Sequence, residues 1–387
     1  MAKKLRKIFI RILFLLFILG NISACLHGCA ATHYKAGATQ GPPFAELTGL
    51  AKWKAMFLGR RIARPEHARN PADVNSKLNP RAEMITHAGG NIAYWMVDAP
   101  NPKGVVIALP DYARSSDDML EAAGIFHSLG YSVAAIDFRG TGKSEGSRTT
   151  LGKREAVDVE VAFKRISQKF PGLPVLLYGA PMGAGAAMKS QYFGRITPAA
   201  CIYEAPYGTL TEFSQARIAD AGLPKMLSFP VLIWGGIVNQ MNPFNFTPDR
   251  FVGGVECPVL FLRGENDSYV SDEDLIAFAD KVPAGLGNYK TIPGADQSQL
   301  LSRANTEVWA REVRSFLATL DRQGVRNAPT QSGVIQNELP ASPSYPRPNR
   351  SGAASGSVDS IDAIEETVRP SVVTPASGAA GEWKELR

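Results

Sequence analysis

The residues that could do chemistry lie in a short turn at positions 179–183, which reads Gly-Ala-Pro-Met-Gly. An aliphatic run at 175–178 precedes the turn, and small residues that suit a closely packed helix follow it. A serine at the centre of a G-x-S-x-G turn between a strand and a helix is presented as a nucleophile that attacks a carbonyl. The central residue here is Pro181, which has no hydroxyl and cannot adopt the strained backbone that presents such a nucleophile. The sequence therefore predicts that Pro181 opens a helix where a catalytic serine would otherwise stand.

A second G-x-S-x-G pattern occurs at residues 142–146, which read Gly-Lys-Ser-Glu-Gly. It follows a different aliphatic strand, and no small-residue helix comes directly after it. The context is a loop, so we interpret Ser144 as a structural residue and not as a nucleophile.

The elements that must position the first turn are read from the hydrophobic pattern. Short aliphatic runs predict strands, and longer amphipathic stretches predict helices. Strands are predicted at 82–86, 92–98, 104–109, 131–137, 175–178, 200–203, 259–263 and 289–292, and helices at 117–129, 154–170 and 306–320. Aliphatic strands that alternate with helices predict an α/β fold, with a mostly parallel sheet and helices on both faces.

One connection, residues 206–255, breaks this alternation and is rich in large apolar side chains. We expect it to form two or three small helices that cap the carboxyl edge of the sheet. Two interpretations are compatible with it: plain core packing, or a lid that lines an apolar pocket.

The first 24 residues have the pattern of a secretion signal. Basic residues are followed by a run at 8–20 that is apolar except for Arg11, which is too short for a comfortable membrane span. Ile22-Ser23-Ala24-Cys25 then resembles the lipobox of bacterial lipoproteins, whose cysteine becomes a diacylated N-terminus. We therefore expect lipidation at Cys25, with an uncleaved anchor or an ordinary signal as the alternatives. The corresponding location is the cell envelope, on the periplasmic side, and Leu26 resembles the outer-membrane sorting pattern.

The rest of the chain divides into three predicted segments. Residues 25–76 are predicted to be a tether with an amphipathic helix, which packs on the main domain or lies on a membrane surface. Residues 77–320 form the main domain, and residues 321–387, rich in Pro, Ser, Gly and Ala, are predicted to be a disordered tail.

Charge and cysteine usage limit the partners. The formal charge is +6, but without the five basic residues of the first 24 it falls to about +1, which gives no support for a nucleic-acid partner. Besides Cys25 and Cys29, the chain has Cys201 and Cys257, which we interpret as core residues that could also form a disulfide. Their spacing fits no metal site, and no motif calls for a cofactor.

Residues 81–320 resemble the α/β-hydrolase superfamily, in particular the branch of serine aminopeptidase-like and monoacylglycerol lipase-like proteins. The segment 130–146 is similar to the family's G-Y-x-V strand and its D-x-R-G-x-G-x-S-x-G loop. The segment 257–267 is similar to P-V-L-x-x-x-G-E-x-D, which carries the triad acid, and 292–298 is similar to P-G-A-x-H-S, which carries the triad histidine. The resemblance implies an α/β-hydrolase fold with a small helical cap.

The same resemblance shows where this chain departs from the family. The triad positions are occupied by Pro181, Asp267 and Gln297, so only the acid is retained. Glutamine cannot relay a proton near neutral pH. The oxyanion loop reads Pro110-Asp111-Tyr112 where the family commonly has His-Gly, and a carboxylate at Asp111 would oppose a developing oxyanion.

No histidine follows His127, which falls in a predicted helix far from the triad loop, and Asp296 has no nucleophile to activate. These departures favour a membrane-anchored protein of the hydrolase fold that lacks hydrolase activity and acts in binding or scaffolding. The bound partner would be an apolar small molecule or a protein.

Two alternatives remain open at this point. One is an active esterase, lipase or peptidase-like hydrolase with a rebuilt site that uses Asp111, Asp267 or Asp296 with water. The other is an interaction role carried by the tail and the tether.

Overall fold

The computed structural model describes residues 34–36, 46–51, 62–66, 78–220, 222–239, 242–296, 300–301 and 305–322. Cys25, Gln297, the predicted signal and all but the first residues of the predicted tail lie outside the described residues, as does most of the predicted tether helix. Among the described residues, no helix has the length and apolar character needed to cross a membrane.

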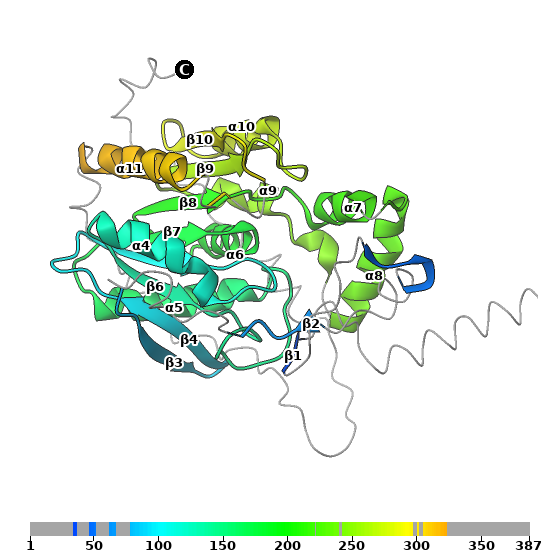
Figure 1. Ribbon diagram of the computed structural model, residues 1–387, viewed down its shortest axis with the longest axis horizontal. Helices are drawn as coiled ribbons and strands as arrows, with labels where there is room; N and C mark the ends of the chain where they lie inside the picture. The colour runs from blue at the N-terminus through cyan, green and yellow to red at the C-terminus, as the bar shows by residue number, and fades with distance from the viewer. Residues whose placement is uncertain are drawn as a thin grey trace, which may run out of the picture.

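The central sheet has eight strands in the order β10-β9-β8-β7-β5-β6-β4-β3 (Figure 1). All neighbouring strands are parallel except for the β3–β4 and β4–β6 pairs, which are antiparallel. Their bounds are β3 Arg81–His87, β4 Gly90–Val97, β5 Val105–Leu109, β6 Ser132–Ile136, β7 Val175–Gly179, β8 Ala200–Glu204, β9 Val259–Gly264 and β10 Gly287–Ile292. The carboxyl ends of the parallel strands therefore meet at one edge, where a site can be built.

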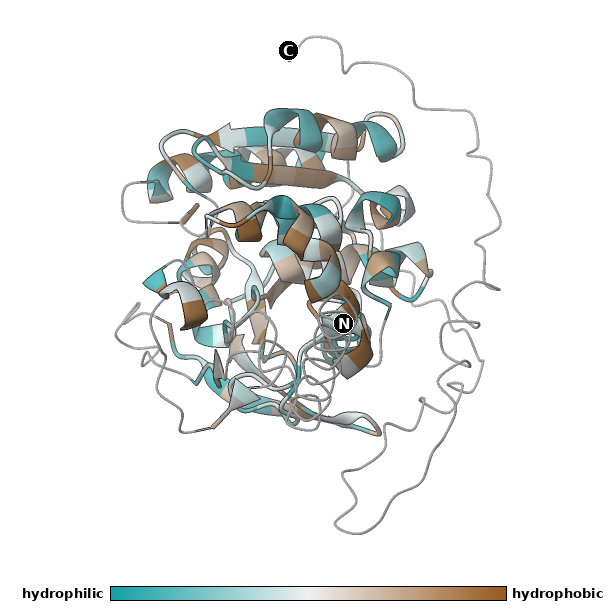
Figure 2. Ribbon diagram, turned by 90° about the vertical axis from the view of Figure 1, so that its right-hand side faces the viewer, coloured by the Kyte–Doolittle hydropathy of each residue, from teal (hydrophilic) through white to brown (hydrophobic). Residues whose placement is uncertain are grey.

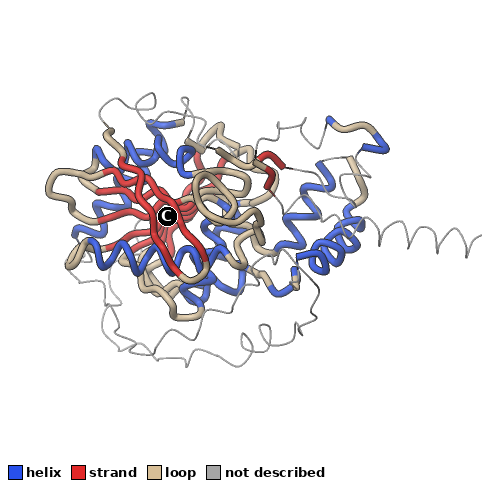
Figure 3. Tube along the Cα trace, turned by 90° about the horizontal axis from the view of Figure 1, so that it is seen from below, coloured by secondary structure: helices blue, strands red, loops and turns tan. Residues whose placement is uncertain are grey.

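Helices cover both faces of this sheet (Figure 3). Alternate residues of β5 face opposite cores: Ile107 and Leu109 lie in one, and Val106 and Ala108 in the other. The first core is closed by α5 Glu155–Lys169, α6 Pro181–Tyr192 and α10 Asp272–Lys281. The second is closed by α4 Leu120–Ser128, which follows the short helix η3 Ser116–Met119, and by α11 Thr306–Arg322.

The helix α11 is held on the sheet by Trp309, which is fully buried. Its indole contacts the rings of Phe126 on α4 and Tyr178 on β7 edge-on, with centroids 5.8 and 5.7 Å apart. Edge-to-face aromatic pairs add to the stabilisation that burial alone provides, so this cluster joins the last helix to the strand that leads to residue 181.

The connection between β8 and β9 forms a set of small helices. It contains α7 Leu210–Asp220, η4 Lys225–Leu227, α8 Ser228–Asn239, η5 Pro243–Asn245, α9 Pro248–Phe251 and η6 Val252–Gly254. We call residues 206–255 the cap. Figure 2 faces the cap and shows α8 as a largely hydrophobic helix.

The sequence-based prediction of the fold is confirmed strand by strand, and α4, α5 and α11 lie where helices were expected. One helix, α10, was not predicted, because within it only Leu275 and Phe278 are buried and its apolar stripe is short. Its start had a signal in the sequence: Ser271 and Asp274 form a capping box. The two-residue strands β1 Tyr34–Lys35 and β2 Ile62–Ala63, which pair in parallel, are too short to leave a pattern.

The close approach of α6 to β5 gives a test of this packing. A Cβ added at Gly183 would lie 2.5 Å from the carbonyl oxygen of Leu109, so the helix would have to move away from the strand. We expect Gly183→Ala to lower the free energy of unfolding by about 1–3 kcal/mol, measured by urea denaturation. The matched control is Gly253→Ala, where a Cβ meets no atom within 4 Å and the expected change is within about 0.5 kcal/mol. Equal stability of the two variants would contradict this account.

Candidate functional site

The turn between β7 and α6 is a relaxed helix start. Ala180 is the N-cap residue in an extended conformation, with φ −69° and ψ 170°, and Pro181 occupies the first turn of the helix. No described residue from 179 to 183 has a positive φ. The strained turn that would present a nucleophile is therefore absent from this segment, as the fixed φ of proline predicts.

The loop after β5 places a carboxylate against this helix start. The backbone N–H of Met182 donates to Oδ1 of Asp111 at 3.0 Å. Burial raises the pKa of Asp111, while the N–H groups of Met182 and Tyr112 and the guanidinium groups of Arg114 and Arg217 act in the opposite direction. A helix N-terminus has a partial positive charge and unsatisfied N–H groups, so a carboxylate is stabilised there.

This contact has a direct chemical meaning. The N–H of the residue after the nucleophile position is the donor that helps to stabilise the oxyanion of acyl transfer. In this chain that residue is Met182, and its N–H already donates to Asp111. A developing oxyanion would meet a carboxylate at the place where it needs donors.

Tyr112, the other residue predicted in the oxyanion loop, packs against the first core. Its ring lies 6.4 Å from the ring of Tyr34, and the hydroxyl of Tyr34 accepts from the N–H of Ala113 at 3.2 Å. The loop after β5 is therefore held from outside by the strand β1.

Asp267 follows β9 and is 8% exposed. Its Oδ1 accepts from the N–H groups of Tyr269 at 2.8 Å and Val270 at 3.1 Å, whereas its Oδ2 is buried and has no hydrogen-bond partner among the described residues. Burial raises the pKa of this carboxyl, and the charge of Asp296 adds to the effect. Asp267 thus combines a loop-capping oxygen with a second oxygen that has no donor in the described part of the chain.

The loops after β9 and β10 lie side by side. The N–H of Asn266 donates to the carbonyl of Ala295 at 2.8 Å, and a Cβ at Gly264 would lie 2.3 Å from the same carbonyl oxygen. This contact brings Asp296 close to the Asp267 loop. Gln297 follows directly in the sequence and lies outside the described residues.

Ser144 and His127, which the sequence analysis considered as candidates, make structural contacts. Ser144 is 1% exposed; its Oγ accepts from the N–H of Ala93 at 2.8 Å and donates to the carbonyl of Asp137 at 2.6 Å. Its structural role is therefore as predicted. His127 lies in the last turn of α4, with Nε2 at 3.2 Å from the carbonyl oxygen of Asp98.

The thiols of Cys201 and Cys257 are buried and free, with their Sγ atoms 3.5 Å apart. A hydrogen bond with Cys201 and burial raise the pKa of Cys257 well above its ordinary value. Both cysteines contribute to the first core, as expected, and the structure contains the pair as thiols and not as a disulfide.

An acid that the sequence did not predict as a site residue lies at the end of β8. Glu204 is 7% exposed, and its Oε1 accepts from the indole N–H of Trp309 at 2.5 Å. Burial raises its pKa to about 7, and the nearby charge of Asp111 contributes to the increase, while hydrogen bonds from Trp309 and Tyr178 oppose it. The only signal in the sequence was an acid that directly ends an aliphatic strand.

The cap contacts this edge through aromatic rings. Phe213 of α7 lies 4.9 Å from the ring of Tyr207 and 5.8 Å from the ring of Tyr269, and the guanidinium of Arg217 lies 5.7 Å from the rings of Phe213 and Tyr269. These contacts link α7 to the loop that contains Asp267, so the cap and the acid loop form one packed unit.

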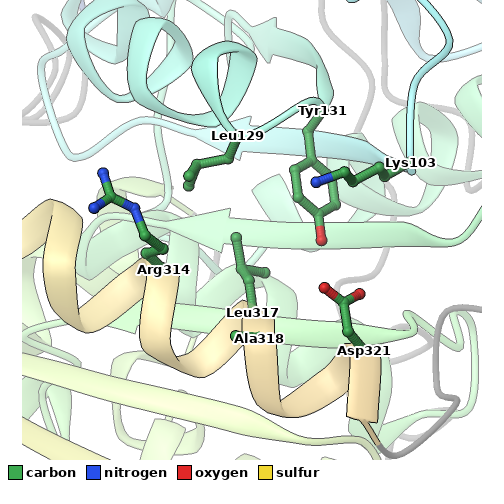
Figure 4. Close-up of a pocket in the computed structure, with 7 residues that line it drawn as sticks. All are labelled: Lys103, Leu129, Tyr131, Arg314, Leu317, Ala318 and Asp321. Atoms are coloured by element: carbon green, nitrogen blue, oxygen red, sulfur yellow. The ribbon is translucent and has the colours of Figure 1, made fainter.

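A separate cavity of about 90 Å³ lies at the opposite end of the sheet. Lys103, which precedes β5, and Tyr131, which precedes β6, face Arg314 and Asp321 of α11 across it (Figure 4). This cavity is at the amino ends of the strands and takes no part in the site described above.

The order of the sheet, its helices and its turns define an α/β-hydrolase fold, and the comparisons with known proteins agree with this fold. The family model for serine aminopeptidase, S33, matches residues 100–221. Among solved structures, the chain is similar to the esterase Pf2001 of Pyrococcus furiosus, with a TM-score of 0.54 and 22% identity over 66% of this chain and 98% of that one.

Among curated proteins, the chain is 29% identical over 160 residues to the lysophosphatidylserine lipase ABHD12 of Danio rerio, a match that covers 41% of each chain. It is 26% identical over 190 residues to the protein of the same name from Mus musculus, covering 48% of this chain and 47% of that one. The chain thus spans less than half the length of these relatives.

The raised pKa of Glu204 predicts a pH dependence of stability. Between the ordinary pKa near 4.5 and the folded value of about 7, the unfolded chain loses the proton and the folded chain keeps it. The contribution of Glu204 to stability is therefore complete below pH 4.5 and is lost as the pH rises to about 7, by roughly 3 kcal/mol at most. We expect Glu204→Gln to remove this component, measured as the free energy of unfolding in urea across this pH range. An unchanged slope in the variant would argue against the assignment.

Proposed function

We propose that this chain is a membrane-anchored protein of the α/β-hydrolase fold that lacks hydrolase activity and acts by binding or scaffolding. The observation that carries the proposal is the hydrogen bond from the N–H of Met182 to Asp111, because it fills the oxyanion position from within the protein. Pro181 at the start of α6 removes the nucleophile at the same place.

Several parts of the serine-hydrolase machinery are replaced at once. Loss of the nucleophile or of the base alone reduces turnover of a serine hydrolase by about a millionfold. In this chain the nucleophile position is proline, the base position is glutamine, and the oxyanion donor is engaged by a carboxylate. Acyl transfer by the serine mechanism would need a different nucleophile, a different base and a different oxyanion donor.

The membrane part of the proposal rests on the sequence before the described residues. The lipobox-like segment that ends at Cys25 would give the mature chain a diacylated N-terminus, and two acyl chains hold a protein stably on a bilayer. The proposed location is the periplasmic side of the cell envelope.

A second candidate is an active hydrolase with a rebuilt site. It is favoured by Oδ2 of Asp267, which is buried without a donor in the described part of the chain and belongs to a carboxyl with a raised pKa. Such an oxygen could act as a base toward water in an ester hydrolase. The names of the relatives, a lipase and an esterase, agree with this candidate.

Turnover of short acyl esters separates the two candidates, and a fluorophosphonate probe tests for an activated serine. We expect the purified full chain to remain unlabelled and to hydrolyse short acyl esters no faster than buffer, because no serine is activated. The triple variant with Pro181→Ser, Asp111→Gly and Gln297→His restores nucleophile, oxyanion donor and base, and we expect labelling at position 181.

Two single variants, Asp267→Asn and Ser144→Ala, test for activity that would contradict the proposal. Ester turnover by the unmodified chain that Asp267→Asn abolishes would establish the rebuilt site and refute the loss of activity. Labelling that disappears with Ser144→Ala would identify Ser144 as a nucleophile, again against the proposal.

A further inference from the structure

One face of α8 is apolar and uncovered. Phe229, Ile233 and Ile237 recur every four residues along this face, and their exposed fractions are 50%, 51% and 63%. The adjacent face is buried through Ser228 and Leu232. A helix that is hydrophobic on all sides is normally enclosed in a protein or in a membrane, so the exposed side of α8 lacks its expected surroundings.

The exposed apolar surface continues beyond α8. Met226 is 76% exposed, and Phe244 is 39% exposed with its ring stacked on Phe229 at 6.1 Å. We call the five residues Met226, Phe229, Ile233, Ile237 and Phe244 the cap face. Contiguous apolar patches of this kind mark sites of interaction with a partner or with a membrane.

The charge of this region is distinctive. Between Asp220 and Asp249 the sequence contains a single charged residue, Lys225, which is exposed and precedes α8. The surface around the cap face therefore has no carboxylate from its own segment that would repel an anionic headgroup. Affinity for a lipid surface comes from the apolar area that inserts, and Lys225 adds electrostatic attraction to anionic lipids.

We propose that the cap face is a membrane-docking surface that inserts into the outer part of a lipid bilayer, with α8 lying along the plane of the membrane. At 12 residues, α8 is about 18 Å long, whereas a span needs about 30 Å, so it can lie in the interface and not cross the bilayer. The choice of a bilayer as the occupant rests on the anchoring in the proposed function.

The route of the N-terminal chain supports that choice. Tyr34 is fixed at the carboxyl edge of the sheet, because its N–H donates to the carbonyl of Ser147 at 2.7 Å and its hydroxyl accepts from Ala113. The cap leaves β8 at the same edge, and Figures 1 and 3 both place β1 and β2 on the side of the body where α7 and α8 lie.

Chain length then limits the orientation. From Cys25 to Tyr34 a fully extended chain spans at most about 30 Å. A domain of this size has a radius of gyration of about 18 Å, so a bilayer that holds Cys25 lies close to the edge that bears the cap. A protein partner would have no such reason to be found on this side.

A fluorescent label on the cap face tests the proposal in the full chain. The environment-sensitive fluorophore is attached at Ile237→Cys in a chain with Cys29→Ser, and Cys201 and Cys257 are buried, so the acylated chain has one accessible thiol. The matched control is Ile276→Cys on α10, an isoleucine that is 39% exposed. On vesicles of equal parts phosphatidylcholine and phosphatidylglycerol, we expect a blue shift and stronger emission for the Ile237 label and no change for the Ile276 label.

A second measurement separates docking from anchoring. In the mature chain, residues 25–387 with Cys25→Ser, which has neither the signal nor an acyl group, Ile233→Glu should weaken partitioning into the same vesicles by about tenfold or more, while Ile276→Glu leaves it unchanged. Circular dichroism shows that each variant is folded.

The outcomes are distinct. The docking surface would be refuted if the protein binds vesicles while the emission of its Ile237 label stays the same as without lipid. It would also be refuted if the emission shifts without lipid and sedimentation shows a dimer. Response of the Ile237 label in a Cys25→Ser chain, together with mass spectrometry that finds the unmodified chain unacylated, would support the docking surface and remove the anchor.

Discussion

The partial positive charge at the start of α6 is the constraint on which the rest of the site depends. The helix begins at the carboxyl edge of the sheet with N–H groups that no residue of the helix can satisfy, and an anion is needed there. An active hydrolase leaves this position open for the oxyanion of its substrate, at a cost in stability. In this chain Oδ1 of Asp111 accepts from the N–H of Met182, so the helix start is stabilised and the position is closed. The proline at position 181 and the hydrogen bond that closes the oxyanion position thus belong to the same helix start.

The other buried acids of this edge follow the same pattern. Asp267 accepts from backbone N–H groups, and Glu204 accepts from Trp309. Burial raises the pKa of both, as it does for Asp111. In a triad an imidazole would meet such an acid, but the sequence has no histidine after His127. Most acceptor oxygens of the edge are satisfied by groups of the framework itself, and this is the arrangement expected of a scaffold. Oδ2 of Asp267, which has no donor among the described residues, fits the alternative instead.

The sequence predicted the fold well because its strands are buried on both faces and therefore appear as aliphatic runs, such as residues 105–109 and 259–264. It failed for α10, whose buried stripe is short. In the site, the sequence predicted the relaxed turn, because proline fixes its own φ, and the adverse charge of Asp111. It could not predict that this carboxylate accepts from Met182, because the two residues are 71 positions apart and meet only through the pairing of β5 with β7. Glu204 was missed for a related reason: its partner Trp309 is 105 positions away.

The polar groups at the carboxyl edge of the sheet are mostly hydrogen-bonded, whereas the apolar cap face is exposed to solvent. This difference bears on what the protein does. Inside, α7 packs Phe213 against the Asp267 loop, and each buried acid accepts at least one hydrogen bond from the framework. Outside, α8 leaves Phe229, Ile233 and Ile237 in contact with solvent, where apolar area costs free energy and favours aggregation. A cap that served only as core packing would bury these residues or replace them with polar ones. If the chemistry beneath the cap has been lost, the exposed apolar face needs a use of its own, and a bilayer close to Tyr34 provides one. The functional surface of this fold would then have moved from the interior of the cap to its exterior.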